Sequence, residues 1–193
     1  MPNTEFTETE VKLFVPDLYP IITALETQGA QCTAPRILER NLRYDTPTRE
    51  LSTERKVLRL RQDTRARLTY KDENQSTTQD NILSRFEAEV EVSDFESMAL
   101  ILTRLGYTPY MQYEKYRTTY HLSGAEIVLD EMPYGNFVEI EGNTNQIEAL
   151  IVQLGLSAAK RLTQSYTALF EVVRAALGLT FTDLTFVNFD GVT

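Results

Sequence analysis

The sequence predicts an α+β fold in which about eight strands close into a small barrel and helices pack outside it. Three observations support this class. Several short runs alternate apolar and charged residues, which is the period of a strand. Turn-forming residues separate these runs, and about eight strands is the number that closes a small barrel. Segments with apolar residues at helical spacing fill the gaps, and 193 residues suffice for one domain with a sizeable core.

The expected strands are rich in β-branched and aromatic residues. They span roughly residues 5–15, 36–45, 56–63, 66–72, 82–92, 112–121, 126–132 and 136–142. We expect hairpin connections at Leu122-Ser123-Gly124-Ala125 and Pro133-Tyr134-Gly135-Asn136. The polar stretch from Asp72 to Asp80 is predicted to be a flexible loop, either covering an opening of the barrel or lying idle on the surface.

Four helices are expected, at about residues 17–28, 93–105, 144–154 and 163–177. The second is predicted to begin at a capping box, Ser93-Asp94-Phe95-Glu96. Residues 1–177 are therefore assigned to the barrel domain. The C-terminal tail, residues 178–193, is apolar and alternating, and both an extra strand and a packing segment remain open for it.

Charged residues recur at alternate positions of the strand-like runs, so each set projects from one face of its strand. The first set is Glu8, Glu10 and Lys12. A sheet with one solvated face also alternates in this way. However, these positions hold almost only acids and bases, in rows of one sign, and this favours a charged lumen that binds an anion and a metal. The other rows are Arg59 and Arg61; Arg67, Thr69 and Lys71; Arg85, Glu87, Glu89 and Glu91; Lys115 and Arg117; Glu139 and Glu141.

Composition excludes several classes of protein. The net charge of −9 argues against broad nucleic-acid binding, although a local cationic cluster can still bind a small polyphosphate. No apolar stretch approaches a membrane span and no signal pattern is present, so a cytoplasmic location is expected. The single cysteine, Cys32, excludes an internal disulfide and is expected to be at least half-buried. We assign no catalytic role to His121.

These motifs, in this order along the chain, resemble those of the CYTH superfamily, the triphosphate tunnel metalloenzymes. The hallmark Glu-x-Glu-x-Lys corresponds to Glu8, Glu10 and Lys12. The likeness spans roughly residues 5–177. Its other elements are Arg59 and Arg61, Lys71, Arg85 with Glu87 and Glu89, Lys115 and Arg117, Asp130, Gly135, Phe137 with Glu139 and Glu141, and the pair Ser165-Tyr166.

The resemblance implies an antiparallel eight-stranded barrel whose lumen is a tunnel for a triphosphate. Phosphate oxygens are then expected to bind Lys12, Arg59, Arg61, Lys71, Arg85, Lys115 and Arg117. Mg²⁺ or Mn²⁺ is expected as cofactor, because carboxylates are hard oxygen ligands. The expected metal ligands are Glu8, Glu10, Asp130, Glu139 and Glu141. Glu8, Glu10 and Lys12 are the expected catalytic residues, and Glu87 and Glu89 are expected to orient the cations.

Two positions depart from the family pattern. The family often carries Asp and an aromatic residue shortly before a Tyr-Asp or Phe-Asp pair, whereas this chain has Asn41 and Arg43 before Tyr44-Asp45. No role is therefore assigned to that strand.

The favoured function is a metal-dependent triphosphatase acting on tripolyphosphate, thiamine triphosphate or a nucleoside triphosphate. A class IV adenylate cyclase, which converts ATP to cyclic AMP and pyrophosphate, is the alternative. Residues 105–109 followed by Glu114-Lys115 resemble such cyclases. A non-catalytic polyphosphate or nucleotide binder is a third reading. The expected partner is a small-molecule triphosphate, with neither nucleic acid nor membrane, and a homodimer is left open.

Overall fold

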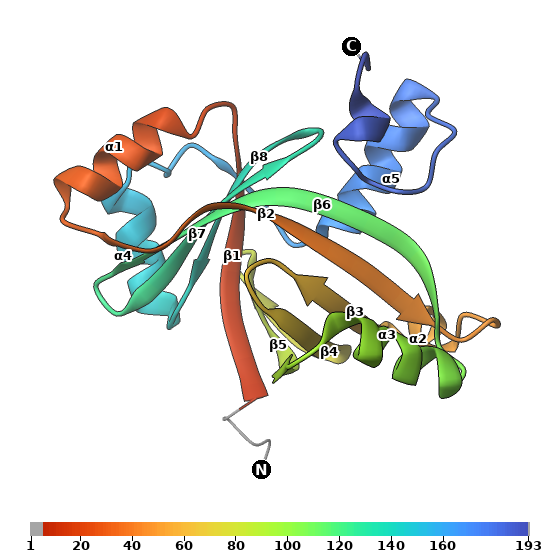
Figure 1. Cartoon of the computed structure of the whole chain (residues 1–193). Coiled ribbons are helices and arrows are strands. Elements are labelled where there is room, and N and C mark those ends of the chain that lie inside the picture. Colours follow the sequence, from red (N-terminus) through yellow and green to blue (C-terminus); the bar gives the residue numbers. More distant parts are fainter. Residues whose placement is uncertain (1–5, 193) are drawn as a thin grey trace.

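Eight antiparallel strands close into a barrel in the computed structural model, which describes residues 6–192 (Figure 1). The sheet order is β5-β4-β3-β2-β6-β7-β8-β1, and β1 pairs with β5 to close the ring, which confirms the predicted fold class. A ninth strand adds to β1 outside the ring. The strands are β1 Thr7–Val15, β2 Gln31–Asp45, β3 Lys56–Gln62, β4 Ala66–Gln79, β5 Ile82–Val92, β6 Thr108–Leu122, β7 Ala125–Met132, β8 Gly135–Glu141 and β9 Lys160–Leu162.

Strand β1 closes the barrel because its two halves have different partners. Its first half, Thr7 to Glu10, pairs with β5, and its second half, Glu10 to Val15, pairs with β8. Beyond the residues that pair with β5, the same edge of β1 pairs with β9 through Lys12, Leu13 and Phe14. The Glu8-x-Glu10-x-Lys12 row therefore spans the junction between the two ends of the sheet.

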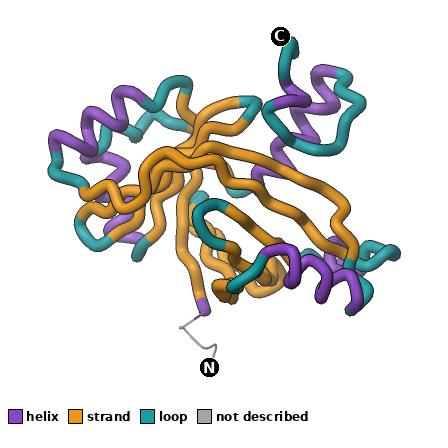
Figure 2. The backbone as a smooth tube through the Cα atoms, viewed as in Figure 1, coloured by secondary structure: helices purple, strands orange, loops and turns teal. Residues whose placement is uncertain are grey.

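The helices lie outside the barrel (Figure 2). They are α1 Tyr19–Thr27, α2 Glu50–Thr53, α3 Phe95–Arg104, α4 Thr144–Gln153 and α5 Tyr166–Leu177, with a short 3-10 turn at Val187–Phe189. Helix α3 begins one residue later than predicted, because Asp94 rather than Ser93 is the N-cap and accepts a hydrogen bond from Ser97 N at 2.7 Å. None of these helices has the length and apolarity that a membrane crossing requires.

The apolar residues that alternate with the charged rows form the core between barrel and helices. Val11 and Leu13 of β1 are buried in one cluster with Leu25 of α1 and Leu150 of α4. Fully burying such a side chain stabilises the fold by about 1.5–3 kcal/mol. The charged residues between them are consequently directed to the inside of the barrel.

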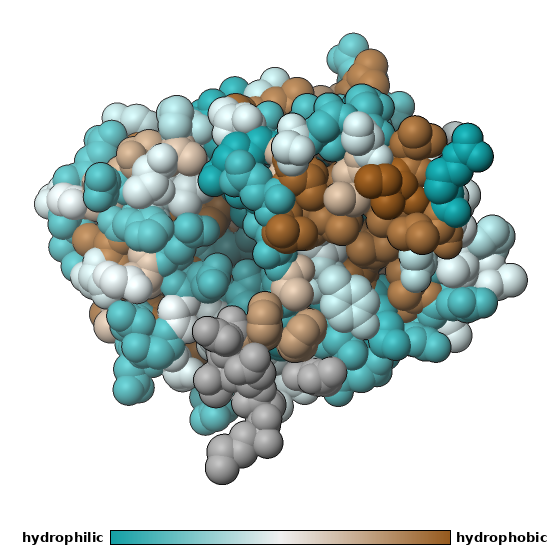
Figure 3. All heavy atoms as spheres, turned by 60° about the horizontal axis from the view of Figure 1, so that its bottom comes forward, coloured by the Kyte–Doolittle hydropathy of each residue, from teal (hydrophilic) through white to brown (hydrophobic). Residues whose placement is uncertain are grey.

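A second cluster packs α3 against β3 and β4. The outer face of α3 nevertheless exposes Leu100, Ile101 and Leu105, and Figure 3 shows hydrophobic side chains gathered on this face of the molecule.

The prediction of a flexible loop from Asp72 to Asp80 is wrong, because β4 continues to Gln79. Thr77 pairs with Ser84 after an irregularity that follows Asp72. Thr suits a pleated strand even where the run is polar, since its β-branched side chain packs on the sheet surface. The chain turns instead at Asp80 and Asn81, both at positive φ, a conformation that Asp and Asn tolerate.

The C-terminal tail packs on its own chain. Leu184 is fully buried and forms an isolated parallel bridge with Tyr113 of β6. Phe181 and Phe189 pack with Phe170 of α5 in an aromatic cluster. The segment therefore covers the barrel beside α5 without forming a strand of the sheet.

Strand β2 begins earlier than predicted, at Gln31, and its first part contains two irregularities of register between Cys32 and Ile37. Only residues 40–44 of β2 pair with β3, so its first part has β6 as its one strand partner among the described residues. This leaves Cys32 exposed, contrary to the expectation that it is at least half-buried.

Candidate active site

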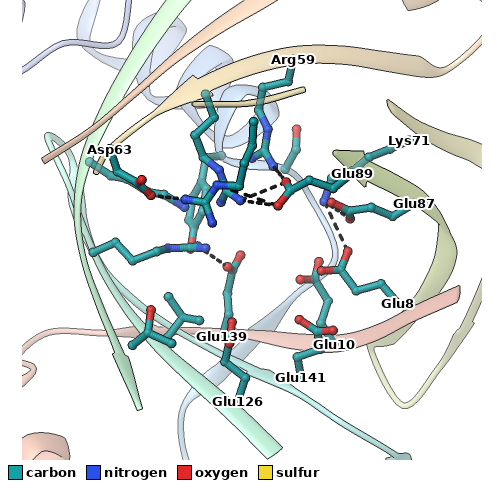
Figure 4. Close-up of a pocket in the computed structure, with 18 of the residues that line it drawn as sticks. Glu8, Glu10, Arg59, Asp63, Lys71, Glu87, Glu89, Glu126, Glu139 and Glu141 are labelled. Atoms are coloured by element: carbon teal, nitrogen blue, oxygen red, sulfur yellow. Dashed lines mark hydrogen bonds and ion pairs between the residues drawn. The ribbon is translucent and has the colours of Figure 1, made fainter. Parts of the chain in front are cut away.

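A cavity of about 500 Å³ lies inside the barrel, and all eight barrel strands contribute to its wall (Figure 4). Ten of the 19 Lys and Arg residues of the chain line it, together with nine acidic residues. The cavity is thus slightly cationic in a protein whose net charge is −9. The predicted site residues on its wall are Glu8, Glu10, Lys12, Arg59, Arg61, Lys71, Arg85, Glu87, Glu89, Lys115, Arg117, Glu139 and Glu141.

Register places these side chains together. In the antiparallel ladders Glu8 lies opposite Arg85, and Lys12 lies opposite Glu139. Lys71 likewise lies opposite Glu87, with which it forms an ion pair. Residues directly opposite one another have neighbouring side chains, so each of these three pairs sets an acid beside a base.

The cationic part of the wall carries unused donors. Buried Nε–H groups without a hydrogen-bond partner occur, within the described part of the chain, on Arg43, Arg59, Arg61, Arg67 and Arg85. A buried donor without an acceptor costs free energy. The acceptors of the protein itself therefore do not satisfy these guanidinium groups completely.

Two of these guanidinium groups are held in the charged state. Burial alone would lower the pKa of Arg59, but Tyr113, Glu39 and Glu87 raise it above its ordinary value. Burial also opposes ionisation of Arg85, and Glu10 and Glu8 raise its pKa. Arg59 and Arg85 therefore keep their positive charges throughout the physiological range of pH.

Asp130 lies behind this wall and is fully buried. Its carboxylate accepts hydrogen bonds from Lys115 at 3.1 Å, from Arg117 Nε at 2.7 Å and Nη2 at 2.5 Å, and from the Tyr166 hydroxyl at 2.8 Å. Ser165 caps α5 and so fixes Tyr166 at the first turn of that helix. The predicted Ser-Tyr pair thus lines the cavity and also contacts Asp130 behind it.

The carboxylates fall into two sets. Those of the first set are paired with cations. Burial alone would raise the pKa of Glu139, but Lys12, Arg117 and Lys115 hold it well below its usual range. Lys12 Nζ lies 3.2 Å from Glu139, and Arg117 Nη2 lies 2.8 Å from it. Against the effect of burial, the hydrogen bond with Glu8 and the charges of Lys71 and Arg59 lower the pKa of Glu87. Burial likewise opposes ionisation of Glu89, but Arg61, Thr69 and Arg59 lower its pKa.

The second set lies together at one side of the cavity (Figure 4). Glu10 and Glu126 both lie opposite Glu141, on β1 and β7 respectively. Burial, together with the charges of Glu8, Glu126 and Glu10, raises the pKa of Glu141 to about 8. Burial also raises the pKa of Glu8, against the attraction of Lys71. If Glu8, Glu10, Glu126 and Glu141 were all ionised, the cluster would carry more negative charge than Lys71 and Arg85 neutralise.

The acidic side chains of the described residues form no ready-made metal site. No three His, Cys, Asp or Glu residues between positions 6 and 192 are placed so that they could hold a metal ion directly. Glu10 instead accepts a hydrogen bond from Arg85 at 2.8 Å, and Lys71 lies 3.3 Å from Glu8. The chemistry of the cluster nevertheless fits a divalent cation, since oxygen donors of like charge meet there without full compensation.

Sequence reasoning missed several residues of the site. Glu39 and Asn41 are fully buried beside Arg61, and Arg43 lines the cavity and donates a hydrogen bond to Thr167 at 3.3 Å. All three belong to the strand to which no role was assigned. Their spacing at every second residue is the signal that could have found them. Glu126 was also missed, although it lies on the same face of β7 as Asp130.

One part of the wall is uncharged. Ala34 of β2, Thr119 of β6 and Val128 of β7 lie opposite one another on three adjacent strands. Pro35 and Ile37 extend this part along the irregular portion of β2. It borders Arg117, which lies opposite Ile37.

Comparison with known proteins agrees with the fold. The model of the CYTH domain family matches residues 7–166. The chain therefore belongs to the CYTH family. No curated protein matches the sequence.

Three solved structures illustrate the likeness. A candidate adenylate cyclase from Vibrio parahaemolyticus has a TM-score of 0.74 at 21% identity, covering 86% of this chain and 98% of its own. A protein from Pyrococcus horikoshii has a TM-score of 0.67 at 25% identity, covering 86% and 99%. A candidate adenylyl cyclase from Hippeastrum, described as having a dominant triphosphatase activity, has a TM-score of 0.64 at 17% identity, covering 86% and 96%.

Proposed function

We propose that the barrel cavity is the active site of a divalent-metal-dependent triphosphatase. The observation that carries this proposal is the division of the cavity into a cationic wall with unused arginine donors and a cluster of poorly compensated carboxylates. A triphosphate needs cations for its oxygens. A divalent metal needs the carboxylates. An ordinary structural network of ion pairs would leave neither group unsatisfied.

The cationic wall binds the triphosphate. Arg59 and Arg61 from β3 and Lys115 and Arg117 from β6 face the same space, so they contact the phosphate chain from two sides. Guanidinium groups bind phosphate oxygens in bidentate fashion. The negative exterior of the protein does not prevent this, because a concave cationic site governs the potential within it.

Glu8, Glu10 and Glu141, with Glu126 beside them, would hold the divalent cation. When bound, Mg²⁺ or Mn²⁺ supplies neutralisation of phosphate charge and lowers the pKa of a water molecule. This set differs from the predicted one, Glu8, Glu10, Asp130, Glu139 and Glu141, because it adds Glu126 and omits Asp130 and Glu139. Asp130 and Glu139 are engaged by Lys and Arg side chains, so we assign them to orienting the phosphate-binding cations, as we do Glu87 and Glu89.

Hydrolysis forms a bond between a water oxygen and the terminal phosphorus and breaks the bond from that phosphorus to the bridging oxygen. The products are orthophosphate and the remaining diphosphate. Lys12 lies 3.2 Å from Glu139 and 4.5 Å from the centre of the Tyr166 ring. From this position its ammonium group stabilises charge that develops on the phosphate oxygens.

The uncharged wall favours a triphosphate that carries an organic group. Inorganic tripolyphosphate would leave Ala34, Val128 and Ile37 without a complementary surface. The hydroxyl of Thr119 and the adjacent apolar side chains suit a sugar or heterocycle attached to the phosphate chain. The Hippeastrum protein, which shares the fold, supports hydrolysis over cyclisation as the dominant reaction.

A panel of substrates tests the proposal. ATP, thiamine triphosphate and tripolyphosphate are incubated with the protein and Mg²⁺ or Mn²⁺, and orthophosphate, pyrophosphate and cyclic AMP are quantified separately. Orthophosphate release that requires the metal is the expected result. Cyclic AMP with equimolar pyrophosphate would instead establish the cyclase, and binding without any product would establish a carrier.

A further inference from the structure

Glu39 is a fully buried carboxylate that joins three strands of the barrel. It lies on β2, and its Oε2 accepts a hydrogen bond from Arg61 Nη1 of β3 at 3.2 Å. Its Oε1 lies 3.4 Å from Lys115 Nζ of β6 and accepts a hydrogen bond from Asn41 Nδ2 at 2.9 Å. The exposed fraction is 0% for Glu39 and Asn41 and 2% for Lys115.

Glu39 stands behind the cavity wall, while its partners are part of that wall. Arg61 and Lys115 line the cavity, whereas Glu39 does not. Substrate would therefore meet the two cations but not the carboxylate. A role of Glu39 in the reaction has to act through Arg61 and Lys115.

Each of the two cations is held between Glu39 and a second carboxylate. Arg61 Nη2 donates to Glu89 at 2.8 Å, and Lys115 Nζ donates to Asp130 at 3.1 Å. Arg61 keeps its Nε–H group free of hydrogen bonds. Two anchors per cation fix the position of the charge.

The charge of Glu39 is maintained by its surroundings. Burial by itself would raise the pKa of this carboxyl, but Lys115, Arg117, Arg61 and Arg59 hold it well below its ordinary value. The negative charge of Glu39 thus reduces the positive potential of the cations nearest to the expected triphosphate.

We propose that Glu39 is a positioning residue that holds Arg61 and Lys115 at fixed places in the phosphate-binding wall and moderates its affinity for anions. The inference rests on the proposed function of the cavity. It assigns Glu39 two separable effects. Fixed cations favour the reacting geometry, and the negative charge limits how tightly the ground-state triphosphate and the products are held.

Replacement of Glu39 by Gln tests both effects, since the amide preserves the shape and removes the charge. We expect tripolyphosphate, titrated calorimetrically in EDTA so that no turnover occurs, to bind about tenfold tighter to Glu39→Gln than to the wild type. With Mg²⁺ and the best substrate of the panel, we expect kcat to fall about tenfold or more while KM falls as well. Glu171→Gln, a change at an exposed glutamate of α5, is the matched control.

A purely structural ion pair would give a different result. One contradicting result is a lower melting temperature together with weaker anion binding. The other is that kcat and KM of the folded fraction stay unchanged. Either outcome overturns the proposal. The double variant Glu39→Gln/Asn41→Asp keeps the test decisive if the single variant folds poorly. It returns one carboxylate to the same face beside Arg61, and we expect it to restore weaker binding and part of kcat.

The binding titration in EDTA and the kinetic assay with Mg²⁺ test the inference and the proposed function separately. If the wild type hydrolyses no triphosphate, the EDTA titration still reports whether Glu39 moderates anion affinity. If the wild type binds no tripolyphosphate either in EDTA or with Mg²⁺, the proposed function itself fails.

Discussion

Glu10 and Glu141 lie directly opposite one another in the ladder between β1 and β8, with Glu126 opposite Glu141 on its other side. Like charges in facing positions destabilise a sheet unless something compensates them. Here the compensation is a proton, because burial and the neighbouring carboxylates raise the pKa of Glu141 to about 8. A divalent cation would replace this proton.

The first prediction concerns pH. Glu141 keeps its proton in the folded protein up to a pH of about 8, whereas in the unfolded chain it ionises near 4.5. Between these values the folded state binds more protons, so its stability falls as pH rises. We expect Mg²⁺ to raise the melting temperature more at pH 8 than at pH 5.5, because at the lower pH the cation must displace the proton. Thermal denaturation with and without Mg²⁺ measures this.

Glu141→Gln serves as the control for this prediction, since it should flatten the pH dependence between pH 5.5 and 8. An equal effect of Mg²⁺ at both pH values would show that Glu141 does not exchange its proton for the metal.

The second prediction concerns the cationic wall. Arg59 donates to the hydroxyls of Tyr113 at 3.2 Å and Thr69 at 3.1 Å, and its Nε–H group is free. Its replacement by Ala should weaken triphosphate binding by about 10- to 100-fold, the value of a charged hydrogen bond, with little change in Mg²⁺ binding. Arg117→Ala should weaken it similarly. Calorimetry with Arg104→Ala, an exposed site on α3, as control measures the difference; equal losses for all three variants would refute the assignment.

The third prediction concerns Asp130, which the sequence predicts to be a metal ligand. Its carboxylate already accepts four hydrogen bonds, from Lys115, Arg117 and Tyr166. We therefore expect Asp130→Asn to weaken triphosphate binding more than Mg²⁺ binding. Breaking a buried pair typically costs about 3–5 kcal/mol, so the variant should also unfold at lower denaturant concentration. Selective loss of Mg²⁺ binding would return Asp130 to the metal-ligand set.

The fourth prediction concerns the C-terminal tail. Leu184 is 0% exposed in the aromatic cluster beside α5, whereas Val187 three residues later is 78% exposed. Leu184→Ala should destabilise the protein by about 2–5 kcal/mol, because it leaves a cavity in a packed cluster. Val187→Ala should change stability by less than about 0.5 kcal/mol. Equal denaturation midpoints for the two variants would mean that the tail contributes nothing to the fold.

The barrel and most of its charged lining could be predicted because a strand places every second side chain on one face. This holds for Glu8, Glu10 and Lys12, where apolar Val11 and Leu13 face the helices. The rows at Arg59, Arg85 and Lys115 follow the same rule. The alternation of apolar and charged residues along each strand determines which side chains share the lumen. The register between neighbouring strands then determines which acids lie opposite bases.

Glu39 escaped prediction because its strand carries charges on both faces. Exposed Arg40 follows buried Glu39 directly, so the alternation of apolar and charged residues is lost there. The division of the carboxylates into a set compensated by cations and a set of facing acids was also beyond the sequence. It depends on register, which sets Glu141 opposite two acids but Glu139 opposite Lys12.

The extension of β4 through Thr77 to Gln79 was missed for another reason. The polar composition of this segment predicts a loop. Its partner strand, β5, begins only after the turn at Asp80 and Asn81. Pairing with β5 stabilises these polar residues as a strand, and pairing is not visible in local composition.

The most direct test of the central claim is orthophosphate release from ATP and tripolyphosphate, measured against Mg²⁺ concentration in the wild type and in Glu8→Gln and Glu10→Gln. We expect saturable Mg²⁺-dependent release in the wild type and a loss of about 100-fold or more in each variant, with unchanged circular dichroism, because the metal supplies several kcal/mol of charge stabilisation. Phosphate release at the wild-type rate in both folded variants would contradict the assignment of this carboxylate cluster.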